Sequence, residues 1–166
     1  MAAGTTYEPI ATQTLGSTAL SVTFSSIPST YTDLVLVCKF STDNPVNNWV
    51  RLNGDTGSNY SNTTLWGNGS TAGSVRNTNE SNGIGFDYYG SDTNKQSTVI
   101  VQLLNYANAT TYKTVLARSS YSTTETAAAV GLWRSTAAIN SLTFRTTATR
   151  VYAVGSIFTL YGIAAA

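Results

Sequence analysis

The feature that most constrains the fold is a series of short runs rich in Val, Ile, Thr, Tyr and Phe, separated by clusters of Gly, Asn, Ser and Pro. Several runs alternate apolar and polar residues. In residues 19–27, Leu20, Val22 and Phe24 share one face of an extended chain. A period of two is typical of antiparallel strands, and no segment carries the apolar stripe of an amphipathic helix. The pattern predicts an all-β fold.

Ten segments fit this description, at spacings typical of two sheets packed face to face. They are residues 12–15, 19–27, 33–41, 48–54, 84–90, 97–106, 112–120, 128–135, 140–146 and 156–163. The third segment, DLVLVCKFS, is more uniformly apolar than the second, as expected of a central strand covered on both faces. A chain of 166 residues suits one domain, so we expect a single antiparallel two-sheet sandwich over residues 1–166.

Two further stretches bear on the organisation of the chain, a long polar tract and the C-terminal residues. Residues 53–83 form a long polar tract, which predicts a functional loop region or a disordered one. Trp66 lies within this tract and indicates that part of it packs, so we expect a partner to order it. The last residues, FTLYGIAAA, follow a strongly β-forming run and are expected to be tied into a sheet or an interface.

Composition argues against several function classes. Charged residues make up only 10% of the chain, and the formal net charge is +1, so the clustered basic surface expected of a nucleic-acid-binding protein is missing. There is no visible secretion signal and no apolar stretch of membrane-spanning length. Without histidine, Ser-His-Asp and Cys-His arrangements cannot form. The single cysteine, Cys38, lies in an apolar run and is expected to be a buried thiol. We therefore expect no enzyme.

Residues 55–57 read Asp-Thr-Gly, the signature of an aspartic protease. Such a protease needs two of these loops sharing a proton, and the chain has one, although a homodimer could supply the second. The preceding Asn-Gly is a strong hairpin-turn signal. Oxygen-bearing residues also alternate as in calcium loops, but with a single carboxylate: Asn53, Asp55, Gly57 and Asn59. We expect a turn, with no catalytic residue, metal or cofactor.

Aromatic residues are the best candidates for partner contacts, because their rings combine apolar faces with polar edges. The candidate partner-binding residues are Trp49, Tyr60, Trp66, Tyr88 and Tyr89. Trp66, among Asn, Gly, Ser and Thr, is the strongest of them. Trp133, in the run AAVGLWRS, is expected in the core instead.

Four blocks together resemble a family of small virion proteins of tailed bacteriophages that infect marine bacteria and cyanobacteria. The blocks are residues 7–37, 51–69, 129–144 and 155–163, and the resemblance runs nearly end to end. It implies a particle-surface structural protein with a β-sandwich fold. Such domains occur as capsid decoration, or cement, proteins and at the ends of tail or fibre proteins. The family carries no catalytic motif, so no site residue is transferred.

The resulting hypothesis is a jelly-roll-like capsid decoration protein on the outer surface of the virion, assembled in the host cytoplasm. It would self-associate as a homotrimer and bridge neighbouring major capsid proteins, with no nucleic acid or membrane as partner. The alternative is a receptor- or glycan-binding module of a tail or head fibre, using residues 53–89.

Overall fold

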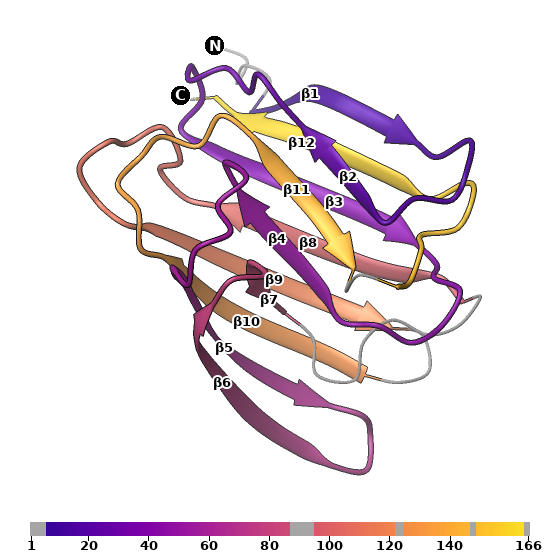
Figure 1. Ribbon diagram of the computed structural model, residues 1–166. Coiled ribbons are helices and arrows are strands. Elements are labelled where there is room, and N and C mark those ends of the chain that lie inside the picture. Colours follow the sequence, from indigo (N-terminus) through magenta and orange to yellow (C-terminus); the bar gives the residue numbers. More distant parts are fainter. Residues whose placement is uncertain (1–5, 87–94, 122–124, 147–148, 165–166) are drawn as a thin grey trace.

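The computed structural model describes residues 6–86, 95–121, 125–146 and 149–164, and this part of the chain forms twelve strands and no helix (Figure 1). No described segment is a helix of the length and apolar character needed to cross a membrane. The strands are β1 (Tyr7–Thr14), β2 (Ser21–Phe24), β3 (Asp33–Phe40), β4 (Asn48–Leu52), β5 (Tyr60–Gly67), β6 (Ala72–Glu80), β7 (Ile84–Gly85), β8 (Ser97–Leu103), β9 (Lys113–Tyr121), β10 (Glu125–Trp133), β11 (Leu142–Thr146) and β12 (Ile157–Ile163).

The strands form two sheets, and their neighbouring strands pair antiparallel. The larger sheet has the order β1-β12-β3-β8-β9-β10-β5-β6, and the smaller one the order β2-β11-β4-β7. Consecutive strands β1 to β4 alternate between the sheets, and β11 and β12 return between the earlier strands of each. This interleaving, β1-β12-β3-β8 opposite β2-β11-β4-β7, is the strand order of a jelly roll. The predicted antiparallel sandwich is confirmed.

Two hairpins make the sheets unequal. β5 and β6 follow β4 in the chain, and β9 and β10 follow β8, yet all four strands join the larger sheet beyond β8. The larger sheet therefore extends past the smaller one, with β6 at its free edge (Figure 1). Of the smaller sheet, β7 reaches this extension and contacts β10 and β5.

The core between the sheets is built on aromatic rings. Phe40 and Phe158 from the larger sheet meet Phe144 from the smaller one at ring-centroid distances of 5.4 and 5.6 Å, and Tyr152 closes the cluster. All four are at most 2% exposed. Burying such a ring stabilises the fold by about 1.5–3 kcal/mol. This cluster is therefore a main source of the packing energy between the two sheets.

β3 departs from its expected environment. Its residues Leu34, Leu36, Cys38 and Phe40 face the smaller sheet and are at most 2% exposed, which confirms the buried thiol. The alternate valines at 35 and 37 point to the other side, which no element of the described chain covers. The prediction of cover on both faces was therefore wrong for this chain alone. Neighbouring side chains of the same sheet shield Val35, which pairs with Gln102 and Tyr161.

Two other expectations need correction. Leu20 lies just before β2 and is 48% exposed, so it does not share the buried face of Val22 and Phe24. Residues 53–83 are not mainly loop, because β5 and β6 occupy most of the tract. The turn between them is built locally: the Asn68 side chain accepts hydrogen bonds from the backbone N–H groups of Ser70 and Thr71. The C-terminal run is tied into a sheet as predicted, since β12 lies between β1 and β3.

Candidate functional site

The Asn-Gly pair that precedes the Asp-Thr-Gly sequence forms a tight turn. Asn53 and Gly54 have φ values of 49° and 66°, and the N–H of Asp55 donates to the carbonyl of Leu52 at 3.0 Å. Positive φ at both central positions is the type I′ arrangement common in hairpins. The strands on either side, β4 and β5, nevertheless belong to different sheets. The predicted turn is confirmed, but it directs the chain from one sheet to the other and does not close a hairpin.

The Asp55 carboxylate serves this turn. One oxygen accepts the backbone N–H of Gly57 at 2.7 Å, and the other accepts Nδ2 of Asn59 at 2.9 Å and Nε1 of Trp133 at 2.7 Å. Desolvation acts to raise the pKa of Asp55, but these hydrogen bonds, with the charge of Arg51, lower it from its ordinary value. Because Trp133 is a core residue, as predicted, the carboxylate fastens the turn to β10.

The oxygen-bearing residues considered for calcium are occupied by protein donors. The side-chain oxygen of Asn53 accepts the N–H groups of Asn140 and Ser141 at 2.9 and 3.1 Å, and Asn59 donates its amide to Asp55. Among the described residues, no group of three or more His, Cys, Asp and Glu side chains could hold a metal ion. The alternating pattern is explained by the hydrogen bonds that hold this loop.

Two of the five candidate contact residues are buried. Tyr60 has no exposed surface, and its hydroxyl lies 3.1 Å from the carbonyl oxygen of Leu52 and 3.2 Å from that of Asp55. Burial raises its pKa to about 12. Trp49 is 8% exposed and lies over Gly85, where an added Cβ would approach the indole to 2.9 Å. Tyr88 and Tyr89 lie outside the described residues.

Trp66 keeps part of its surface accessible. It lies near the end of β5, opposite Gly73 of β6, and is half-buried. An added Cβ at Gly73 would lie 2.9 Å from the indole, so the ring rests directly on that glycine. Trp66 thus packs within its own hairpin while exposing one side. Of the five candidates, it is the described residue best placed to contact a partner.

The most unusual surface was not singled out by sequence reasoning. It is the outer face of the larger sheet, meaning the side turned away from the smaller sheet. Leu65 on β5 and Val130 on β10 point outward and are 61% and 53% exposed, and Leu116 on β9 lies in the same row as Val130. An open groove of about 500 Å³ follows β10 between these side chains. Apolar residues at the outward positions of β5 and β10 could have indicated this surface, but β5 was not recognised as a strand from the sequence.

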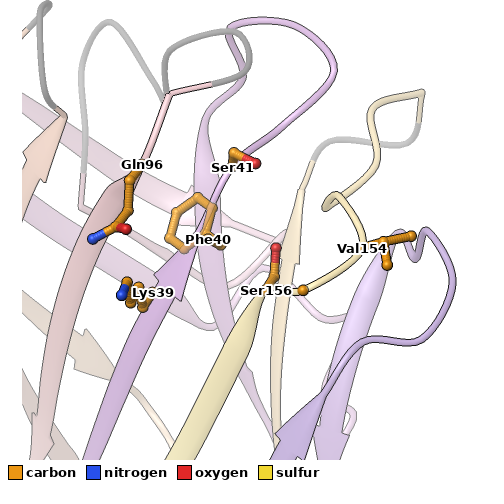
Figure 2. Close-up of a pocket in the computed structure, with 7 residues that line it drawn as sticks. Lys39, Phe40, Ser41, Gln96, Val154 and Ser156 are labelled. Carbon is orange, nitrogen blue, oxygen red and sulfur yellow. The ribbon is translucent and has the colours of Figure 1, made fainter.

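A smaller hollow of about 260 Å³ lies at the far end of β3 (Figure 2). Lys39 and Gln96 lie on one side of it, and Val154 and Ser156 lie on the other. The Ser156 hydroxyl already donates to the carbonyl of Ala153 at 2.7 Å. This hollow is mainly polar and close to loops, whereas the groove along β10 is apolar and lies on regular strands.

Fold and surface together define a jelly-roll sandwich with an extended sheet, whose outer face exposes apolar side chains among the described residues. No protein-family model matches the chain, and no curated protein matches it.

Proposed function

We propose that this chain is a structural protein of a phage virion, a capsid decoration protein that binds the outer capsid lattice. It acts as a homotrimer and stabilises the head by bridging major capsid proteins. The observation that carries the proposal is the outer face of the larger sheet. A solvated face of an antiparallel sheet is normally polar, but here Leu65, Leu116 and Val130 point outward. Contiguous exposed apolar surface of this kind marks protein contacts.

Low charge and the resemblance to phage virion proteins support the same function. With 10% charged residues and a net charge of +1, copies of the chain can pack closely without strong repulsion. A protein that binds only the assembled shell stabilises that shell by mass action. Repetition over a symmetric lattice adds avidity to contacts that are individually weak. No chemical step is required.

The test is reconstitution on capsids assembled without this protein. We expect purified protein to bind in a copy number that matches the lattice points and to raise the temperature at which the capsids break open. Cryo-electron microscopy gives the positions, and quantitative gel staining gives the copy number. Absence of binding at saturating protein would contradict the proposal. A few copies at tail or fibre tips would favour the alternative, a receptor- or glycan-binding module.

A further inference from the structure

The groove along β10 arises from the sizes of neighbouring outward side chains. In the antiparallel register, Ala128 of β10 lies between Leu65 of β5 and Arg118 of β9. In the next row, Val130 lies between Thr63 and Leu116. A short side chain between longer ones leaves a notch over Ala128, and Val130 and Leu116 border it in the next row. We call this surface the β10 groove and define it by Thr63, Leu65, Leu116, Arg118, Ala128 and Val130.

Among the described residues, the charged side chains around the β10 groove are arginines. Arg118 and Arg76 are exposed, and Arg76 lies opposite Thr63 at the groove's margin. Neither arginine forms an ion pair with a described residue. The described strands β5, β6, β9 and β10 contain two carboxylates. Glu125 is buried on the inner face, and Glu80 lies at the end of β6, where its backbone is opposite that of buried Tyr60. The groove therefore presents apolar surface and two available guanidinium groups.

We propose that the β10 groove binds an extended, acidic and apolar peptide segment of the protein that this chain decorates. Apolar side chains of that segment lie in the notch over Ala128, and its carboxylates pair with Arg118 and Arg76, since guanidinium groups bind carboxylates through two parallel hydrogen bonds. A volume of about 500 Å³ is within the range of ligand sites, roughly 300–1,000 Å³. Placing the segment on the capsid protein rests on the proposed function.

Charge also distinguishes this occupant from a second copy of the chain. If two copies packed through their β10 grooves, the positively charged arginines of both copies would lie in one interface. Their mutual repulsion costs free energy where water is excluded. Strand addition is excluded at this position as well, because β10 is already paired on both sides, with β9 and β5. The segment therefore binds through its side chains to the face of the sheet.

The experiment uses two groove variants with matched controls. Ala128→Trp fills the notch and Arg118→Glu reverses its charge; both positions are exposed, so circular dichroism and thermal unfolding should match wild type. The controls are Thr14→Trp, which adds a tryptophan at an exposed position of β1, and Lys39→Glu, which reverses a charge at an exposed position of β3. Both positions lie outside the groove. We expect the groove variants to bind capsids about tenfold or more weaker, and the controls to stay within about twofold of wild type.

A second arm measures the groove without capsids. Fluorescein-labelled octapeptides with a Leu-Val-Leu centre, flanked by Glu in one version and by Lys in the other, are titrated with each protein. We expect binding of the Glu version only, lost in both groove variants. Equal binding of the two versions, or binding of neither, would overturn the acidic preference.

The arms separate the two proposals. Capsid binding that is unchanged in both groove variants would overturn the assignment of the groove while leaving the decoration function intact. If wild-type protein does not bind capsids but binds the Glu peptide through the groove, the decoration function is rejected. The peptide-binding assignment of the groove is then retained. Loss of self-association in the groove variants would show that a second copy occupies the groove, against our proposal.

Discussion

At Asp55, a single carboxylate holds its own turn together and connects it to β10. Its oxygens hold the backbone of Gly57, the amide of Asn59 and the indole of Trp133 on β10. The indole stacks on the ring of Tyr60, with centroids 6.3 Å apart. A short sequence associated with proteolysis therefore has a structural use here, joining the turn after β4 to the larger sheet.

We predict that Asp55→Asn destabilises the protein by about 1–2 kcal/mol, because one of the three N–H donors then faces an amide nitrogen instead of an oxygen. Urea unfolding measures the change. Asp43→Asn is the matched control: its 4.0 Å pair with Arg150 is exposed, and such pairs contribute about 0–1 kcal/mol. The hydrogen bond that Asp43 Oδ1 accepts from the N–H of Val151 at 3.0 Å can be kept by the side-chain oxygen of Asn. Equal effects of the two substitutions would show that the Trp133 contact does not stabilise the fold.

The same carboxylate predicts a pH dependence. The folded-state pKa of Asp55 lies below its ordinary value, so the ionised group stabilises the fold at pH values above about 3.9, the pKa of an unfolded Asp. That contribution disappears as the pH falls through the lower, folded-state pKa. We therefore expect the difference in unfolding free energy between wild type and Asp55→Asn to shrink between pH 5 and pH 2, measured in urea. A constant difference would contradict this assignment.

Residue type alone did not show which aromatic side chains are accessible. Trp133 was expected in the core and is there, because apolar neighbours accompany it in β10. Tyr60 was expected at a contact surface, yet it begins β5 with its ring facing inward. The face on which a side chain lies follows from strand parity, and parity cannot be assigned where a strand has not been recognised.

At the scale of elements, the strands of the β5–β6 hairpin could not be predicted from the alternation of apolar and polar residues. Strands such as β8 were predictable because their inward residues are apolar. In β5 the inward positions include Asn62 and Thr64, which are buried at 4% and 0% exposure, so apolar and polar residues do not alternate. Tertiary pairing with β10 overrides this weak local pattern. The run of Tyr, Thr and Trp was the remaining strand signal.

The position of Trp66 predicts a local effect of its removal. Its ring rests on Gly73 in the same hairpin, at the free edge of the larger sheet. We expect Trp66→Ala to leave the sandwich folded but to cost the hairpin about 1–2 kcal/mol, the share expected for a half-buried ring. Hydrogen exchange should speed up over residues 60–80 and stay unchanged in β3 and β8.

The exposed Ser74→Ala change on β6 is the control for that experiment. If Trp66 also contacts the capsid, as the sequence predicts for a partner-binding residue, occupancy on particles will fall in Trp66→Ala and not in the control. Global unfolding of Trp66→Ala would instead place the residue in the core.

At the scale of the whole molecule, the unequal sheets determine what remains exposed. Four strands of the larger sheet extend past the jelly roll, so this sheet presents a broad outer face and two free edges, β1 and β6. The β1 edge is interrupted by Pro9 and by a register shift before Ala11, features that discourage strand pairing. The nine-residue β6 contains no proline, and its register shift lies at its end, where Asn79 is skipped between Thr78 and Glu80, so the regular stretch before it is the more open edge.

We predict that the chain is a homotrimer in solution, because closed symmetric association hides sheet edges that a lone sandwich would expose. Sedimentation equilibrium at micromolar concentration should give three times the chain mass of 17.6 kDa. With a net charge of +1, long-range charge contributes little to the contacts, so the trimer should persist when the salt concentration is raised to about 0.5 M. Dissociation in salt would mean that ion pairs, rather than apolar and backbone contacts, hold the subunits. Monomers both in solution and on particles would reject the trimer and leave β6 as an edge that this protein exposes.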